Sequence, residues 1–363
     1  MEKLNKVYAL RKNLHMIAEK SFQEEKTMNC LIEFIENNTD FLIEKREKWF
    51  YAFKKGNKIA EEPIALRCDM DGITLSENQT GHYCGHDGHC AIICYVAMLL
   101  SDIELNRDVY LIFQPAEEIG KGAKICCELL KEKNIKEIYG LHNIPGYPVN
   151  QILLRKSTFA CGSTGLRINY IGKPTHAAYP QNGINPTDAF IELINFTKDI
   201  SEKAQNEILF STVVGLNLGS EQFGMSAYKG HLNLTVRAEK QSSFEYILNE
   251  IKNEAIMIAE KYKLLCDIEE IDYFPATENN DECVMKVLKT CQNSNITYQI
   301  LQEPMRWSED FGYYLQKISG AFFGIGDGLK YPQLHSECYE FNDEIIETAA
   351  TLFKNIIFYN EKV

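Results

Sequence analysis

The sequence lacks an excess of positive charge and any long apolar stretch. Its 363 residues include 38 lysines and arginines against 51 aspartates and glutamates, which gives a net charge of −13. A chain this acidic has no electrostatic footprint for nucleic acid or for an anionic membrane surface. The longest uninterrupted apolar run, 91–100, is about half as long as a helix that crosses a bilayer. We therefore expect no nucleic-acid partner and no membrane span, and this run is typical of a buried helix.

The sequence also lacks a CxxC motif and the core of a signal peptide. Its twelve cysteines are scattered along the chain, which does not fit a small disulfide-stabilised scaffold. The N-terminal residues place charges among their apolar side chains, whereas a signal peptide needs an unbroken apolar core. Val7, Leu10 and Leu14 recur at helical spacing instead. These absences favour reduced thiols and a cytoplasmic location.

No internal repeat, low-complexity tract or flexible linker interrupts the sequence, whose length predicts roughly two domains. In its first part we expect short apolar strands at 64–66, 109–113 and 138–141, separated by helices at about 88–100 and 121–132. Apolar, non-alternating strands separated by helices indicate an α/β domain whose central sheet is covered on both faces.

Polar side chains follow each of these strands. Asp69 and Asp71 come after the first strand and Glu117 and Glu118 after the second, and His142 ends the third. In open α/β sheets, ligands bind beyond the carboxyl ends of the strands. We therefore expect these side chains to meet at one edge of one sheet.

Residues 164–274 differ in pattern from the rest. Strands are expected at 166–171, 212–218, 231–237 and 264–271, with helices at 186–204 and 244–262. This β-α-β-β-α-β order is the ferredoxin-like arrangement. The chain then returns to alternating elements, with a strand at 321–325 and a C-terminal helix from about Asp343. We predict a discontinuous first domain, 1–163 and 275–363, into which a second domain of residues 164–274 is inserted.

Three of the eight histidines lie within residues 81–89, together with a cysteine and an aspartate. Cys84 and His86 stand two apart, and Gly85 between them lets the backbone turn so that both side chains can reach one cation. A thiolate with an imidazole suits zinc or another late transition metal, and not magnesium or calcium. The alternative is a histidine-rich turn or adventitious metal binding.

Glu117 and Glu118 are adjacent and follow Pro115, where the strand is expected to end. Two carboxylates side by side repel each other and raise one pKa unless a cation lies nearby. One glutamate as a metal ligand and the other as a proton shuttle would relieve that repulsion. A solvated loop or a helix N-terminus, where glutamates are favoured, is the alternative.

Three further histidines stand alone. His142 ends a strand of the alternating series, His335 lies in a late loop, and His176 follows the first strand of the inserted domain. A single histidine is more often an ordinary surface or core residue than a ligand. Only His142 gains support from its place in the strand series.

Together these segments resemble the M20 metallopeptidase superfamily, and within it the amidohydrolase branch of aminoacylases, hippurate hydrolases, auxin-conjugate hydrolases and N-acetyldiaminopimelate deacetylases. They span most of the chain in the family's order, and their combination is specific although one alone is weak. The matching segments are 67–71 (RCDMD), 84–89 (CGHDGH), 113–118 (FQPAEE), 141–142 (LH), 176–178 (HAA), 308–311 (SEDF) and 334–335 (LH).

The resemblance implies a site for two divalent transition-metal ions, Zn, Mn, Co or Ni. Glu117 matches the general base, and Asp71 matches an acid that orients a ligand. His176 matches a histidine of the inserted lid domain, which can reach a neighbouring subunit's site and steady the oxyanion. The residues that match the metal ligands are Cys84, at the bridging position, His86, Glu118, His142 and His335.

The resemblance also implies an activity and a partner. The first domain is expected to be catalytic, and the inserted domain to serve as lid and as the surface of a homodimer. The implied reaction hydrolyses the amide bond of a small-molecule N-acyl amino acid, such as an N-acetyl or N-benzoyl amino acid or N-acetyldiaminopimelate, to a carboxylate and a free amino acid. The alternatives are a dipeptidase or aminopeptidase with the same site, a catalytically silent binding member of the fold, and a metal-buffering protein.

The sequence departs from the family pattern at positions that border the pocket. The loop between Asp71 and Cys84 is short, and Thr74 stands where the family has a proline. Pro174 and Thr175 replace the usual pair of glycines before the lid histidine. These departures bear on the choice of substrate rather than on metal binding.

Overall fold

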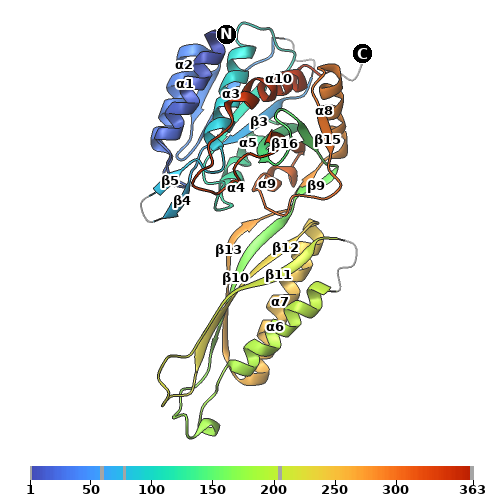
Figure 1. The fold of residues 1–363 in the computed structure, drawn as a ribbon. Coiled ribbons are helices and arrows are strands. Elements are labelled where there is room, and N and C mark those ends of the chain that lie inside the picture. Colours follow the sequence, from blue (N-terminus) through green and yellow to red (C-terminus); the bar gives the residue numbers. More distant parts are fainter. Residues whose placement is uncertain (1, 58–60, 77–78, 203–206, 360–363) are drawn as a thin grey trace. The chain divides into compact units, whose positions relative to one another are not determined.

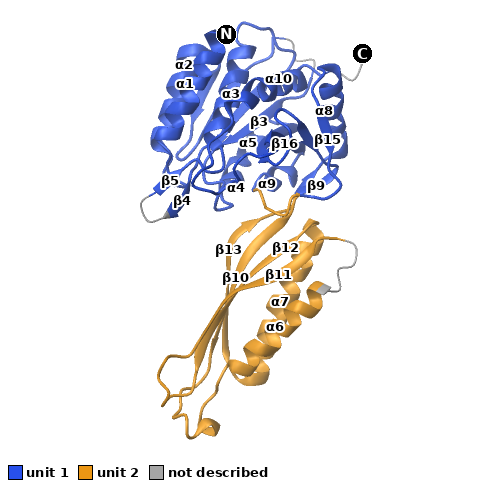
Figure 2. Ribbon diagram, viewed as in Figure 1, with its two compact units in different colours: residues 1–159, 277–304, 310–363 blue, residues 160–276, 305–309 orange. Residues whose placement is uncertain are grey.

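The computed structural model of the chain describes residues 2–57, 61–76, 79–202 and 207–359. The chain divides into two compact units, drawn in blue and orange in Figure 2. Unit 1 comprises residues 1–159, 277–304 and 310–363, and unit 2 comprises residues 160–276 and 305–309. Sequence reasoning did not set the segment 305–309 apart from its neighbours.

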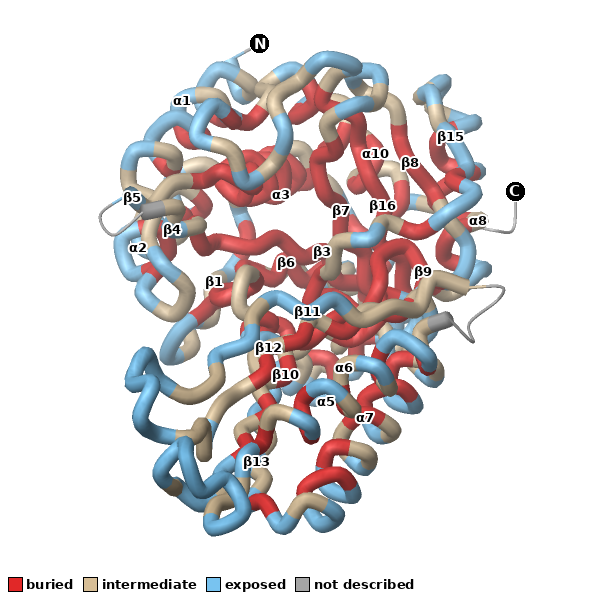
Figure 3. Tube along the Cα trace, turned by 60° about the horizontal axis from the view of Figure 1, so that its bottom comes forward, coloured by how far each residue is buried: buried red, intermediate tan, exposed pale blue. Residues whose placement is uncertain are grey.

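Unit 1 is built on a mixed eight-stranded sheet. In order across the sheet its strands are β1 (Leu42–Lys45), β2 (Phe50–Lys54), β6 (Val109–Gln114), β3 (Ile64–Asp69), β7 (Glu137–Pro145), β16 (Ser319–Gly328), β8 (Ile152–Leu154) and β15 (Tyr298–Ile300). The central strands β6, β3, β7 and β16 run parallel. β3 and β6 are buried at every position, as strands in a sheet covered on both faces must be, and Figure 3 shows them in red.

Helices flank this sheet, which confirms the predicted α/β class (Figure 1). They are α1 (Glu2–Met16), α2 (Glu25–Asn38), α3 (His86–Leu100), α4 (Gly122–Cys126), α5 (Glu128–Glu132), α8 (Asp281–Asn293), α9 (Gly312–Leu315) and α10 (Ile346–Ile357). The predicted helix 121–132 is divided at Cys127, and the C-terminal helix begins as a 3-10 turn, Asp343–Ile345. Within the described ranges, every helix is too short or too polar to cross a membrane.

Two small two-stranded sheets accompany the large one. They pair β4 (Ile73–Ser76) with β5 (Gln79–Gly81), and β9 (Ser157–Ala160) with β14 (Thr277–Asn279). The β4–β5 hairpin occupies the loop that leads from the end of β3 to α3. The short connection noted in the sequence is therefore a folded hairpin for the part that the structure describes.

Unit 2 has a four-stranded antiparallel sheet in the order β11-β12-β10-β13. Its elements along the chain are β10 (Gly162–Ile171), α6 (Thr187–Glu202), β11 (Leu209–Leu218), β12 (Lys229–Ala238), α7 (Gln241–Tyr262) and β13 (Leu265–Phe274). This is the strand-helix-strand-strand-helix-strand order expected from the sequence, although residues 203 and 204 of the predicted first helix lie outside the described residues. Alternate residues of β10, Leu166, Ile168 and Tyr170, are buried in the core of the unit.

A buried ion cluster lies beneath the carboxyl ends of the central strands of unit 1. Arg67 on β3 donates from Nη1 to Asp69 Oδ2 at 2.7 Å and from Nη2 to Asp310 Oδ1 at 2.9 Å. Its Nε donates to Gln114 Oε1 on the neighbouring strand at 2.8 Å. Because none of these side chains contacts bulk water, each charge depends on the others for its compensation.

We expect the substitution Arg67→Met to lower the free energy of unfolding by about 3–5 kcal/mol, since it leaves two buried carboxylates, Asp69 and Asp310, without their cation. Urea denaturation measures the change. Arg46→Met is the matched control, because Arg46 pairs with two glutamates while one third of its side chain is exposed, and such pairs contribute less than about 1 kcal/mol. Equal effects of the two substitutions would contradict this account of the cluster.

Candidate metal centre

The candidate site lies in unit 1, where neighbouring parallel strands end. Asp71 follows β3, and Glu117 and Glu118 follow β6. His142 lies within β7 and does not end it, so that detail of the prediction is wrong: β7 continues to Pro145 because β16 runs beside it through Gly328. The carboxyl ends of β3 and β6 and the carboxyl-terminal part of β7 nevertheless bring these residues to one edge of the sheet, as the sequence predicts.

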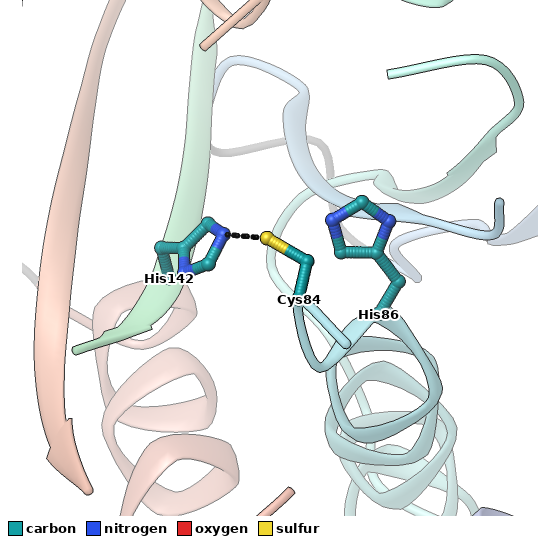
Figure 4. A group of neighbouring side chains, drawn as sticks. All are labelled: Cys84, His86 and His142. Atoms are coloured by element: carbon teal, nitrogen blue, oxygen red, sulfur yellow. Dashed lines mark hydrogen bonds between the residues drawn. The ribbon is translucent and has the colours of Figure 1, made fainter. Parts of the chain in front are cut away.

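Cys84 occupies the middle of the cluster. Its Sγ lies 3.3 Å from His142 Nε2 and 3.3 Å from His335 Nε2. Figure 4 shows the Cys84 side chain between the rings of His142 and His86. Gly85 separates Cys84 from His86 with a φ of 92°, a left-handed conformation that favours glycine. The tight turn between loop and helix therefore lets both side chains face the same space.

The two glutamates extend the cluster. Glu118 Oε1 lies 3.6 Å from His86 Nε2, and Glu118 Oε2 lies 3.8 Å from His335 Nε2. Glu117 Oε2 lies 3.9 Å from His86 Nε2. Several groups of potential ligand atoms lie within 4.8 Å of one another, among them Cys84–His86–His142, Cys84–Glu118–His335, His86–Glu117–Glu118 and Asp69–His86–His89.

Adjacent residues of a strand point to opposite faces, yet both glutamates face this cluster. The strand ends at Gln114, and Ala116 adopts a left-handed φ of 51°. The Asp71 carboxylate then accepts the backbone N–H of Glu117 on Oδ1 and that of Glu118 on Oδ2, each at 3.1 Å. Asp71 therefore holds the turn on which both glutamates stand, and Ser21 donates to the same carboxylate at 2.7 Å.

Hydrogen bonds fix the tautomers of two histidines. His86 Nδ1 faces the backbone carbonyl of Asp71 at 2.9 Å, and His142 Nδ1 faces that of Asn143 at 2.8 Å. A carbonyl oxygen accepts, so each Nδ1 carries the proton. In the neutral ring each Nε2 then presents its lone pair to the cluster, which is the arrangement of metal-binding histidines.

Two ligand atoms in the cluster are buried without a hydrogen bond. Among the described residues, His86 Nε2 and Glu118 Oε1 have no partner, although burial normally requires one. The donor set of thiolate, imidazole and carboxylate is that of zinc and neighbouring transition metals. The residues present therefore fit a metal site.

Burial and neighbouring charges shift the pKa values of the proposed metal ligands. Burial, together with the carboxylates of Asp71 and Asp69, raises the pKa of Glu118 to about 8. Burial also raises the pKa of the Cys84 thiol and lowers the pKa of His142. These three shifts favour the uncharged side chain. His86 differs: burial lowers its pKa, but the Asp69 and Asp71 carboxylates outweigh burial and raise that pKa, so that its charged form is favoured while no cation balances these acids.

Sequence reasoning assigned no role to two residues that support the site. His89 lies with Nδ1 2.6 Å from Asp69 Oδ1 and with Nε2 2.5 Å from Asn143 Oδ1. Its ring lies edge-on to that of His142, with the centroids 4.8 Å apart. His89 belongs to the histidine-rich segment and could have been singled out there, whereas Asn143 has no comparable sequence feature.

His176 belongs to a different unit from the other site residues. It lies in unit 2, in the exposed loop between β10 and α6. Its Nδ1 accepts the backbone N–H of Ala178 at 3.0 Å. Its place near the reaction centre therefore stays a prediction.

Comparisons with known proteins agree with this description. The model of a family described as peptidase family M20/M25/M40 matches residues 65–359. An N-acetyldiaminopimelate deacetylase of Limosilactobacillus reuteri (strain DSM 20016) is 29% identical over 381 aligned positions, which cover 96% of this chain and 97% of the relative. The Bacillus subtilis protein YXEP, whose crystal structure is described as a dinuclear metal binding peptidase from the M20 family, superposes with a TM-score of 0.83 at 24% identity over 98% of both chains. The aminopeptidase PepT from Bacillus cereus ATCC 10987 superposes with a TM-score of 0.75 at 13% identity, again over 98% of both chains.

The two superpositions establish a shared fold across the whole chain. The family match covers the central strands, the cysteine–histidine loop and the paired glutamates. It also covers His142 and His335, the two histidines that lie 3.3 Å from Cys84 Sγ. The chain thus belongs to peptidase family M20/M25/M40, and it is a hydrolase that acts on amide bonds.

Proposed function

We propose that this chain hydrolyses the amide bond of N-acyl amino acids and releases a carboxylate and a free amino acid. The observation that carries the proposal is the cluster around Cys84, in which a thiol, imidazoles and carboxylates meet with two ligand atoms left unpartnered. Relatives named N-acetyldiaminopimelate deacetylase, which align over 90–96% of the chain, support an N-acyl amino acid as the substrate class.

Two divalent transition-metal ions, Zn, Mn, Co or Ni, are the proposed cofactors. Cys84 is shared by the group with His86 and His142 and by the group with Glu118 and His335, so its thiolate would serve both ions. The similar Bacillus subtilis protein is described as dinuclear, which supports this number. When bound, such ions would supply positive charge that acidifies water and polarises an amide carbonyl.

Glu117 is the proposed general base. It is 6% exposed and stands on the same turn as Glu118, next to the proposed ligands. Its carboxylate would accept a proton from the attacking water and return it to the nitrogen of the leaving amine, so that the proton count balances. Asp71 would keep the base aligned through the backbone N–H groups that it accepts. His176 is proposed to donate to the carbonyl oxygen as negative charge develops.

An aminopeptidase or dipeptidase activity is the second candidate, and the similarity of fold to the Bacillus cereus aminopeptidase favours it. Such an enzyme must recognise the free α-amine of its substrate, which requires an acidic group in the pocket beyond the metal ligands. An N-acyl substrate has no free α-amine. The two candidate activities therefore differ in the contact between that amine and an acidic group, which a matched pair of substrates can test.

We also propose a homodimer formed through unit 2, and a cytoplasmic location. β11 is an edge strand of its sheet and exposes Val213, Val214 and Leu216, and edge strands present unpaired backbone groups to a partner. The proposed ligand Cys84 must stay a reduced thiol, which suits a reducing compartment.

Cobalt titration of the metal-free protein tests the ligand set. We expect two equivalents of Co²⁺ to bind with a thiolate-to-cobalt charge-transfer band, because Cys84 is the thiolate in the cluster. Cys84→Ser should abolish the band and weaken binding. Cys266→Ser, at a partly exposed cysteine of unit 2, should leave both unchanged. A band of native intensity in Cys84→Ser would exclude this cysteine as a ligand.

Substitutions of Glu117 and Glu118 should have different effects, because the two residues have different proposed roles. We expect Glu117→Gln to bind metal as the wild type does and to lower kcat at least ~100-fold, because the amide cannot accept the proton. Glu118→Gln should instead lower metal affinity, since it removes a proposed ligand. Metal analysis together with steady-state kinetics distinguishes the two variants, and a near-native kcat for Glu117→Gln would remove that residue from the mechanism.

A substrate panel tests the activity itself. With metal restored, the protein should hydrolyse N-acetyl amino acids, N-benzoylglycine or N-acetyldiaminopimelate with a higher kcat/KM than the matching unblocked dipeptides. The reverse order would favour the aminopeptidase. Failure of the metal-loaded protein to hydrolyse any member of the panel would favour a silent binding protein.

A further inference from the structure

Glu24 lies far from the site in sequence and next to it in space. It belongs to the segment that joins α1 to α2, and it is 3% exposed. Its Oε1 accepts the backbone N–H of Ala116, 92 residues away, at 2.8 Å. Ala116 immediately precedes Glu117, the proposed general base. The Glu24 carboxyl group therefore contacts the backbone of the turn that carries the base.

The local structure of α2 does not require Glu24 to take this position. Glu24 occupies the N-cap of α2, where a side chain normally accepts an N–H of its own helix, but its side chain makes no such bond. Glu19 does so instead: its Oε2 accepts the N–H groups of Lys26 and Thr27 at 2.8 and 3.0 Å. The helix is thus capped by Glu19, and Glu24 is directed at the turn.

The turn needs such an external acceptor. Ala116 has a left-handed φ of 51°, which costs an L-residue roughly 1 kcal/mol or more. Its carbonyl accepts the N–H groups of Lys121 and Gly122, so the turn closes on itself at that oxygen. Side-chain carboxylates from other segments accept its N–H and those of the two glutamates after it. Glu24 accepts the first of these three, and Asp71 accepts the other two.

The Glu24 carboxyl group is buried beside a second acid, Asp71. Burial, together with the nearby Asp71 carboxylate, raises the pKa of Glu24 to about 7. Its Oε2 is buried and has no hydrogen-bond partner among the described residues. A glutamine at this position keeps an acceptor oxygen at the same reach from the Ala116 N–H.

We propose that Glu24 is a positioning residue that holds the strained Ala116 turn, and so directs Glu117 and Glu118 at the metal centre, through the hydrogen bond to the Ala116 N–H. The part that concerns Glu117 as base rests on the proposed function. The part that concerns the turn rests on geometry alone. Without this bond, the left-handed φ of Ala116 can relax and both glutamate side chains turn with it.

Three substitutions of Glu24 distinguish the effect of its side-chain length from the effect of its charge. Glu24→Gln keeps an acceptor oxygen at the same reach, Glu24→Asp keeps the acid but is one methylene shorter, and Glu24→Ala removes the acceptor. We expect hydrogen–deuterium exchange of peptides that contain Ala116 to be about tenfold faster in the Ala and Asp variants, and native in the Gln variant. We expect kcat to fall roughly 10- to 100-fold in the same two variants, with KM little changed.

Glu19→Ala is the control for a merely structural effect. It removes the cap of α2 and should lower the unfolding midpoint, but it should leave both the exchange of the Ala116 turn and kcat unchanged. Native exchange of the turn in Glu24→Ala and Glu24→Asp would overturn the proposal, as would a Gln variant as impaired as the Ala variant. Because exchange is measured without substrate, it still decides the proposal if the wild type hydrolyses no N-acyl amino acid, a result that would refute the proposed function alone.

Discussion

The parallel alignment of β6, β3 and β7 is the constraint on which the site depends. Because parallel neighbours end at the same edge, the residues that follow them are brought together whatever their separation along the chain. The loop to α3 adds Cys84 and His86 at this edge, and the late loop adds His335. Apart from the neighbouring pairs Cys84–His86 and Glu117–Glu118, these residues are far apart along the chain, so only the fold brings them together.

The charges at this edge fall into two sets. In the first, Arg67 compensates Asp69 and Asp310 through short hydrogen bonds, and the protein supplies both partners. In the second, His86 and Glu118 each keep a buried ligand atom without a partner, although His86 Nε2 is 3.6 Å from Asp69. Arg67 compensates only part of the charge of the first set, and the unpartnered buried atoms of the second set are those that a bound cation would contact. Asp69 belongs to both sets, because its carboxylate also forms a group of potential ligand atoms with His86 and His89.

The fold class and most of the cluster could be predicted from the sequence. Apolar runs mark the central strands, and the cysteine–histidine segment is dense enough to stand out by itself. His335 needed the family resemblance, because an isolated loop histidine carries no pattern. Glu24 could not have been found, since the hydrogen bond that joins it to the Ala116 turn links residues 92 positions apart. The left-handed φ of Ala116 was equally hidden, because no glycine marks it.

The return of the chain from unit 2 has a consequence for biosynthesis. Residues 305–309 belong to unit 2, and Asp310, the next residue, is the second carboxylate bound by Arg67. The two partners are 243 residues apart, so the ribosome releases β3 and all of unit 2 before Asp310 emerges. β16, which pairs with β7, emerges later still. During synthesis, unit 1 therefore stays incompletely paired until its last strand has emerged, by which time all of unit 2 is already available for folding.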